Sequence, residues 1–327
     1  MTNPFVFIVG CPRSGTTLLQ RIVNAHPLIA IIPEIGWLLA RYQDRNFVTP
    51  EDLVKPAFLQ DLIQRGGLGR YTRLPVSQQE LEELLLRIRH CPIEYSELVT
   101  LFFDRYGEAQ GKALVGNKTV DYVKNFYALH TLWPQAKIVH LIRDGRDVCL
   151  SATHWRRADR LANQFATWRE KPVSTAALWW EWQVRLGREA GSLLNDKLYH
   201  EIRYEDLVSD PTGTCQALCD FLDIPYDEAM LRFHEGREKQ ETDLDAKHAW
   251  RPPTPGLRDW RTQMPQPDLV QFEAVAGELL GELGYPRGVH QMSAENLYHA
   301  FQLRERFEGR PLPQHWYTAL PESRFTR

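Results

Sequence analysis

Residues 5–19 read FVFIVGCPRSGTTLL, and no other stretch of the chain says as much about its architecture. Residues 5–9 form a short, continuous apolar run, which is typical of a strand buried on both faces of a parallel sheet. A glycine loop follows from Gly10 to Gly15. Residues 16–25 then carry apolar side chains at helical spacing, until His26-Pro27 ends the pattern. The order of strand, glycine loop and helix predicts the first unit of an α/β sheet.

The loop has the G-x-x-x-x-G spacing of a phosphate-binding loop. Backbone N–H groups of such a loop, with the helix N-terminus behind them, form a site for an anion. A nucleotide triphosphatase has Lys where this chain has Thr16, whereas here the positive charge is Arg13, inside the loop. A guanidinium can grip a phosphate or a sulfate bidentately without a metal. The alternative is an ordinary Gly/Pro turn before a helix. The residues expected to bind the anion are Arg13, Ser14, Gly15, Thr16 and Thr17.

Further apolar runs resemble the first strand. Residues 137–142 and 198–203 are each followed by a turn and a helical pattern, residues 113–116 are a weaker candidate, and residues 28–32 are a short strand-like run. Strands separated by helical segments indicate βαβ units. The predicted fold is therefore α/β, a P-loop-like three-layer sandwich with a mostly parallel central sheet and a helical insertion.

The chain is predicted to be one domain over residues 1–290, followed by an extension over residues 291–327 that has one helical segment and a Pro- and aromatic-rich end. Residues 41–111 are expected to be the helical insertion over the sheet. Residues 232–261 are polar and Pro-rich, and are predicted to be a variable loop near the acceptor and the cofactor. The insertion is predicted to contain two amphipathic helices, residues 78–90 and 94–106.

Composition narrows the function classes. Hydrophobic residues make up 43% of the chain and charged residues 25%, which is the balance of a globular protein. The net charge is −3 with no tail of like charge, which argues against wide nucleic-acid contact or a polybasic membrane anchor. The five cysteines have no spacing typical of a disulfide framework or a zinc site. No signal peptide or membrane span is recognisable, so a cytoplasmic location is expected.

A second anion site is predicted after the strand at residues 137–142. Arg143 lies at the end of this strand and Ser151 lies two helical turns further on, so both can converge on one phosphate. Asp144 or Asp147 can cap the helix between them. The alternative is an exposed ion-pair cluster, the usual outcome for such a run of charges.

These motifs together resemble those of a known family. Residues 11–18, followed by His26-Pro27, resemble the 5′-phosphosulfate loop of sulfotransferases that use 3′-phosphoadenosine 5′-phosphosulfate (PAPS). Residues 142–147 with Ser151 resemble the family's 3′-phosphate motif, residues 203–211 its third landmark, and residues 281–286 the close of its last core helix. The similarity is greatest to the tyrosylprotein and heparan-type branch, whose loop is of the PRSGTT type.

The resemblance implies roles for individual residues. Glu34, in the segment after the His-Pro pair, is the expected general base, with apolar neighbours around it. Lys118 matches the lysine that bridges the sulfate and the leaving oxygen, and Arg13 is the third catalytic candidate. The alternatives are a Glu that favours a helix dipole and a solvated surface Lys. A histidine base is the rival, with His140 expected to be strand core and His130 and His154 anchored by no motif.

Other cofactor contacts follow from the same resemblance. Tyr204 is expected either to stack on the adenine or to be a core aromatic that ends a strand. Arg251, Arg258 and Arg261 lie where the family's last phosphate-contacting loop belongs, and Trp260 fits its aromatic residue. The cofactor set predicted in this region is Arg251 and Arg258, together with Arg143, Ser151 and Tyr204. Trp179, Trp180 and Trp182, at helical spacing, are expected to be core.

The leading hypothesis is in-line transfer of a sulfuryl group from PAPS to a hydroxyl acceptor, which is a small molecule, a sugar or a peptide, with release of adenosine 3′,5′-bisphosphate (PAP). No metal and no nucleic-acid or membrane partner is expected, and a homodimer is possible. One alternative is a P-loop kinase of a small metabolite, which Thr16 in place of Lys disfavours. The other is a non-catalytic nucleotide-binding protein on the same fold.

Overall fold

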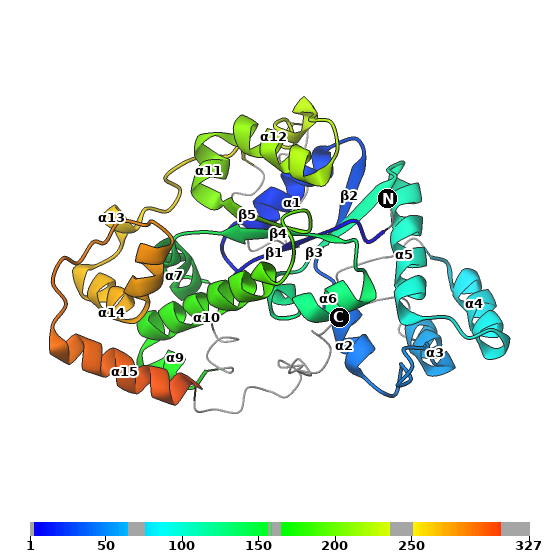
Figure 1. The fold of residues 1–327 in the computed structure, drawn as a ribbon, viewed down its shortest axis with the longest axis horizontal. Coiled ribbons are helices and arrows are strands. Elements are labelled where there is room, and N and C mark those ends of the chain that lie inside the picture. Colours follow the sequence, from blue (N-terminus) through cyan, green and yellow to red (C-terminus); the bar gives the residue numbers. More distant parts are fainter. Residues whose placement is uncertain (1–2, 65–75, 156–157, 159–164, 236–250, 309–327) are drawn as a thin grey trace.

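The computed structural model describes residues 3–64, 76–155, 158, 165–235 and 251–308. Its centre is a five-stranded sheet in the order β2-β3-β1-β4-β5, and every neighbouring pair is parallel (Figure 1). The strands are β1 (Val6–Val9), β2 (Ile29–Ile32), β3 (Leu114–Lys118), β4 (Lys137–Ile142) and β5 (Tyr199–Arg203). The predicted parallel α/β architecture is confirmed. The weak run at residues 113–116 proves to be a full strand, β3, that extends to Lys118.

Alternate side chains of β1 explain its continuous apolar sequence. Val6 and Ile8 belong to one hydrophobic cluster, whereas Phe7 and Val9 belong to another on the opposite face of the sheet. A central strand that is covered on both sides must be apolar at every position. The same strand therefore places the glycine loop at the carboxyl edge of the sheet.

Helices cover both faces of the sheet, which gives the three layers visible in Figure 1. One layer packs α1, α11 and α12 on the sheet, and the other contains α6 and α10 with the helices outside them. The described helices are α1 (Thr16–Ala25), α2 (Trp37–Gln43), α3 (Pro56–Gln64), α4 (Gln78–His90), α5 (Tyr95–Gln110), α6 (Phe126–Leu132), α7 (Gly145–Thr153), α9 (Thr167–Glu170), α10 (Pro172–Ser192), α11 (Tyr204–Ser209), α12 (Pro211–Leu222), α13 (Trp260–Gln263), α14 (Gln266–Glu282) and α15 (Ala294–Glu308), with 3₁₀ turns η1 (Val120–Lys124) and η2 (Glu228–Met230).

The predicted insertion contains α3, α4 and α5. Helix α4 has the bounds expected from its periodicity, and a capping box between Ser77 and Glu80 fixes its start. Helix α5 is longer than the predicted 94–106 and packs on β3, where the absent side chain of Gly107 lets the backbone of Lys112 approach. Its buried side chains join the core cluster of one sheet face, so these helices have no separate core.

Two sequence predictions lie partly outside the described residues. The variable loop predicted at residues 232–261 is described only before 236 and after 250. The Pro- and aromatic-rich end of the predicted extension, residues 309–327, is not described, whereas its helical segment is α15. Within the described ranges, none of the helices combines the length and apolar character needed to cross a membrane. The five cysteines are unpaired.

Candidate functional site

The glycine loop is folded as an anion-binding loop requires. Gly10, Arg13 and Gly15 have φ of 153°, 77° and 99°, so a non-glycine residue adopts the left-handed conformation inside the loop. A Cβ on Gly10 would lie 2.5 Å from the carbonyl oxygen of Leu141, in β4. The Ser14 hydroxyl is buried and has no hydrogen-bond partner. A buried polar group without a partner is uncommon, so this hydroxyl is available to a ligand of the loop.

Arg13 links the loop to helix α7. Its Nε donates a hydrogen bond to the Ser151 hydroxyl at 3.0 Å, and its guanidinium lies 5.4 Å from the centre of the Trp155 ring. Two residues that were predicted from separate motifs, 138 positions apart, are thus in contact. Arg13 therefore stands between the predicted 5′ and 3′ sites.

Lys118 and Glu34 form an ion pair beside the loop. Lys118 ends β3 and is in register with Ile8 of β1, two residues before Gly10. Its Nζ donates to Glu34 Oε1 at 2.8 Å, while the two side chains are 5% and 50% exposed. The apolar neighbours expected around Glu34 are present in the chain, since Ile32 and Ile35 are buried, but half of the Glu34 side chain is exposed and its carboxylate is paired with Lys118.

Arg143 is held by an aromatic ring and a carboxylate. Its guanidinium carbon lies 4.2 Å from the centre of the Tyr204 ring, and its terminal nitrogen lies 3.5 Å from Asp147 Oδ2. Arg143 Nε is buried without a hydrogen-bond partner. The Tyr204 ring also lies against the loop, because a Cβ on Gly15 would be 2.5 Å from one of its atoms. Tyr204, 9% exposed, therefore contacts both the loop and Arg143.

Asp144, and not Asp147, caps α7, accepting from the Arg146 amide at 2.9 Å. Asp147 accepts instead from the Trp260 amide at 2.9 Å and so ties α7 to α13. Burial raises the pKa of Asp147 to about 6, although Arg143 opposes the shift. The pKa of Arg258 is lowered by burial and, to a smaller extent, by the positive charge of Arg143.

Arg146 is structural. It is fully buried, pairs with Asp144 and with Glu273 at 2.7 Å each, and stacks 3.5 Å from the Trp260 ring centre. Glu273 also accepts from the amides of Gly288 and Val289, at 2.8 and 3.0 Å. Burial alone would raise the pKa of Glu273, but these donors and the neighbouring arginines give a net lowering. Sequence analysis missed this network, since no local pattern marks Glu273 as buried.

The other candidates are placed as follows. Arg251 is exposed, and Arg261 is exposed and paired with Asp259 at 3.4 Å. Arg258 is half-buried. Trp179 and Trp180 are core, as predicted, whereas Trp182 is only partly buried and lies 5.1 Å from the Lys124 ammonium.

The three histidines considered as rival bases lie in β4, at the end of α7 and in α6. His140 is completely buried in β4, as predicted, and burial lowers its pKa to about 4. His154 is exposed at the end of α7 and contacts the Leu150 carbonyl oxygen at 2.8 Å. His130 lies in α6, on the segment between β3 and β4. Among the described residues, no group of three or more His, Cys, Asp and Glu side chains is arranged to hold a metal ion.

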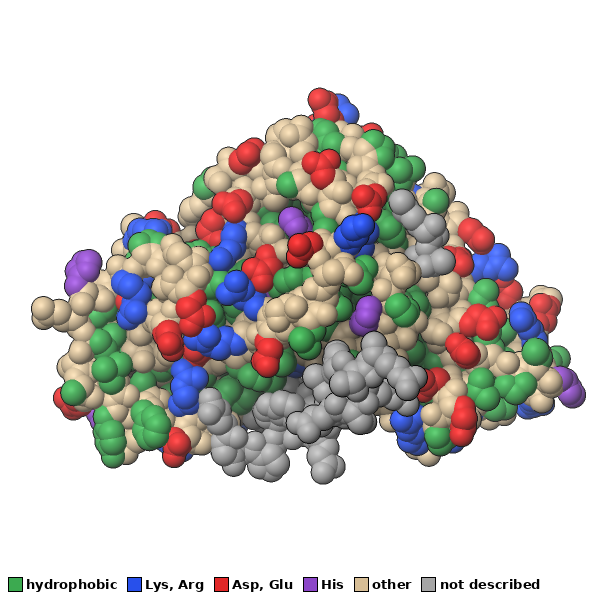
Figure 2. All heavy atoms as spheres, in the orientation of Figure 1, with side chains coloured by type: hydrophobic (Ala, Val, Ile, Leu, Met, Phe, Trp, Pro, Cys, Tyr) green, Lys and Arg blue, Asp and Glu red, His purple; other side chains and the backbone are tan. Residues whose placement is uncertain are grey.

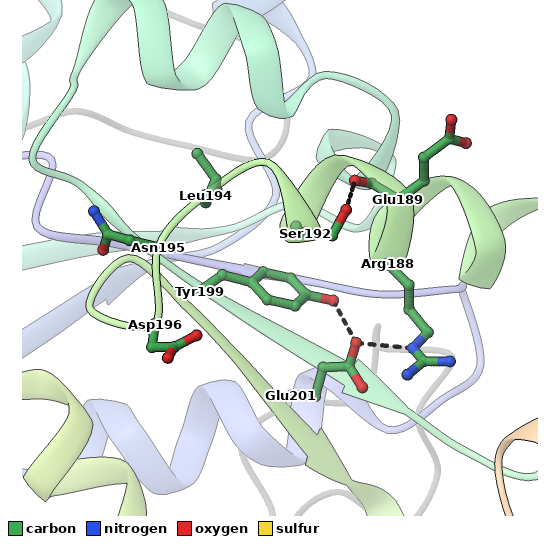
Figure 3. Close-up of a pocket in the computed structure, with 9 residues that line it drawn as sticks. Arg188, Glu189, Ser192, Leu194, Asn195, Asp196, Tyr199 and Glu201 are labelled. Atoms are coloured by element: carbon green, nitrogen blue, oxygen red, sulfur yellow. Dashed lines mark hydrogen bonds and ion pairs between the residues drawn. The ribbon is translucent and has the colours of Figure 1, made fainter.

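A cavity of about 390 Å³ lies elsewhere, between the end of α10 and the start of β5 (Figure 3). In Figure 3 the Tyr199 hydroxyl points at Glu201, 2.9 Å away, and Arg188 reaches the same carboxylate oxygen at 3.0 Å. Because β5 begins at Tyr199, this cavity is at the amino edge of the sheet. It is separate from the loop, Lys118 and Arg143, which lie at the carboxyl edge.

Taken together, the fold and these groups define a P-loop-like α/β protein with a cationic site at the carboxyl edge of its sheet. A family model described as "Sulfotransferase family" matches residues 4–228. The chain therefore belongs to the sulfotransferase family and is an enzyme of that class.

Individual relatives agree. Protein-tyrosine sulfotransferase A of Caenorhabditis elegans is 23% identical over 295 residues, which cover 87% of this chain and 68% of the relative. Protein-tyrosine sulfotransferase 1 of Homo sapiens is 24% identical over 291 residues, which cover 86% of this chain and 70% of the relative. Among solved structures, the sulfotransferase domain from the Synechococcus PCC 7002 olefin synthase is similar in fold, with a TM-score of 0.58, 22% identity, and coverage of 87% of this chain and 96% of that domain.

Proposed function

We propose that this chain transfers a sulfuryl group from PAPS to a hydroxyl acceptor, with Glu34 as the general base. The observation that carries the proposal is the Lys118–Glu34 pair, at 2.8 Å, beside the glycine loop. A buried cation next to a carboxylate that is half exposed provides charge stabilisation and a proton acceptor at adjacent points of one site.

The residues of the site fit the proposed co-substrate. When bound, PAPS would supply an activated sulfuryl group and a bisphosphate leaving group. The unpartnered Ser14 hydroxyl and the left-handed backbone at Arg13 suit the 5′ group, as do the loop residues Gly15, Thr16 and Thr17. Arg143, with its unpartnered Nε, suits the 3′-phosphate. Ser151, Tyr204, Arg251 and Arg258 remain predicted contacts.

The chain's own residues then have distinct tasks. Lys118 donates from its ammonium towards the oxygen on which charge develops, and Arg13 adds a second cation across the loop. Glu34 has one oxygen bonded to Lys118 and is exposed enough for an acceptor hydroxyl to approach. The carboxylate would accept the hydroxyl proton as the acceptor oxygen bonds to sulfur, while the bond between sulfur and the bridging oxygen of the 5′-phosphate breaks and PAP leaves. This division resembles phosphoryl transfer, where positioning and charge do most of the work.

The acceptor class is tested by transfer of ³⁵S from labelled PAPS to a panel: a tyrosine-containing peptide, a phenol, a sugar and an alkyl alcohol. The peptide is included because relatives of this chain carry the name protein-tyrosine sulfotransferase. Labelled product with at least one acceptor, lost in Lys118→Met, supports the proposal. Binding of PAP without transfer to any class would favour a non-catalytic nucleotide-binding protein. Magnesium-dependent turnover of ATP would favour a kinase.

A further inference from the structure

The segment that carries Glu34 is held by side chains outside the proposed chemistry. Asn117, the residue before Lys118, is completely buried, although it is polar and lies at the end of a strand. Its Nδ2 donates to the carbonyl oxygens of Ile32 and Pro33, at 3.0 Å each. Both hydrogen atoms of one amide are therefore used by two successive residues just before Glu34.

Thr119 holds the other side of Glu34. Its hydroxyl accepts from the Ile35 amide at 2.9 Å and donates to Asn117 Oδ1 at 2.8 Å. Tyr122 then donates to the Ile35 carbonyl oxygen at 2.6 Å. Two backbone groups before Glu34 and two after it are thus bonded to three buried side chains. These side chains follow one another from the end of β3 into η1.

The arrangement is chemically complete. The Asn117 amide has two donors and one bonded acceptor oxygen, and the Thr119 hydroxyl donates once and accepts once. Buried polar networks in which every member is satisfied rigidify and specify a single conformation. Within the described part of the chain, the Glu34 carboxylate takes no part in this network and is bonded to Lys118. The backbone therefore sets where its carboxylate lies.

We propose that Asn117, Thr119 and Tyr122 are positioning residues that hold residues 32–35 as a clamp and so place Glu34 against Lys118. The clamp residues and Lys118 belong to the same continuous segment, 117–122, so this one segment positions both the base, Glu34, and the cation, Lys118. This inference rests on the proposed role of Glu34. A loose clamp would leave cofactor binding intact but misplace the base, and a misplacement of about 1 Å can cost roughly 100-fold in rate.

Thr119→Val tests the clamp, because valine has the shape of threonine without its hydroxyl. Turnover of PAPS with the most active acceptor of the panel should fall about 10- to 100-fold, while PAP affinity changes less than about twofold. Thr119→Ser, which keeps the hydroxyl, should restore turnover. In a Glu34→Gln background, Thr119→Val should cause no further loss of turnover, since both substitutions remove the same function, proton acceptance by Glu34.

Tyr95→Phe is the matched control. It removes another buried hydroxyl, which donates to the Leu38 carbonyl oxygen in α2 at 2.5 Å, so it lowers stability without touching residues 32–35. Its turnover, measured well below the melting temperatures of both proteins, should stay at the wild-type value. If Thr119→Val does not fold, Tyr122→Phe takes its place, with a smaller loss expected because a single bond is removed.

The crystal structures of Thr119→Val and Thr119→Ser give a readout independent of activity. The Glu34–Lys118 contact should persist with serine and be lost or displaced with valine. Wild-type turnover together with an unchanged contact in Thr119→Val would overturn the clamp while leaving the proposed function intact. If Glu34→Gln kept full turnover, Glu34 would not be the base. The Glu34–Lys118 distance in the two variant structures would then be the sole test of the clamp.

Discussion

Arg143→Ala should weaken binding of PAP far more than binding of adenosine 5′-phosphosulfate, which lacks the 3′-phosphate. Arg143 is buried, its Nε has no hydrogen-bond partner and its contact with Asp147 is long, at 3.5 Å. Its donors are therefore poorly used by the protein itself. A hydrogen bond to a charged group contributes about 1.5–3 kcal/mol, which predicts a loss of roughly 10- to 150-fold in affinity for PAP.

The comparison of two ligands separates this contact from damage to the site. Removing Arg143 also leaves Asp147 without its cation and uncovers one face of Tyr204. Both effects would lower the affinity for either nucleotide, so only the difference between the two losses reports on the 3′-phosphate. Isothermal titration with both ligands gives the two values. Arg143→Lys should recover part of the PAP affinity, because it keeps the charge without the planar fork. Equal losses for both nucleotides would show that the 3′-phosphate binds elsewhere.

Three further outcomes are expected. PAP titration should give the same affinity with and without EDTA, because Arg13, Lys118 and Arg143 supply the positive charge; loss of binding on chelation would contradict this. Glu273→Gln should lower the free energy of unfolding in urea by about 3 kcal/mol, since it breaks a buried pair with a fully buried arginine, and a change below about 1 kcal/mol would refute the structural role. Burial raises the pKa of Asp147 from 3.8 to about 6, so the folded state binds this proton more tightly than the unfolded state, and the resulting stabilisation is lost as the pH rises through that range. Asp147→Asn should remove this decline from the free energy of unfolding measured against pH. A decline of the same size in the wild type and the variant would contradict this prediction.

Local periodicity was enough for most elements. Helix α1 and strand β4 have the predicted bounds, because the apolar residues of α1 repeat at helical spacing and residues 137–142 are a mostly apolar run. Strand β3 was underestimated because its last two residues, Asn117 and Lys118, are polar and yet buried. Buried polar residues at a strand end break the rule that buried strands are apolar, and here they belong to the site and its supports.

Long-range contacts were the part that the sequence could not give. Motif positions placed Arg13 and Ser151 in separate sites, and only the fold brings them within 3.0 Å. The choice between Asp144 and Asp147 as helix cap depended on where α7 begins, which sequence patterns locate only to within a few residues. The mixed surface charges in Figure 2 likewise say little about the site, whose decisive charges are mostly buried.

Turnover of Glu34→Gln tests the central claim most directly, with Glu108→Gln as a control that removes another exposed ion-paired carboxylate, bonded to Arg105 at 3.0 Å. Glutamine keeps the size of the side chain and cannot take the acceptor's proton. The expected result is a fall of about 10²- to 10⁴-fold in transfer from PAPS, with PAP affinity nearly unchanged and a greater loss for alkyl alcohols than for phenols, while the control keeps its activity. Full turnover of Glu34→Gln, accompanied by a lowered melting temperature, would contradict the account and leave Glu34 with a structural role only.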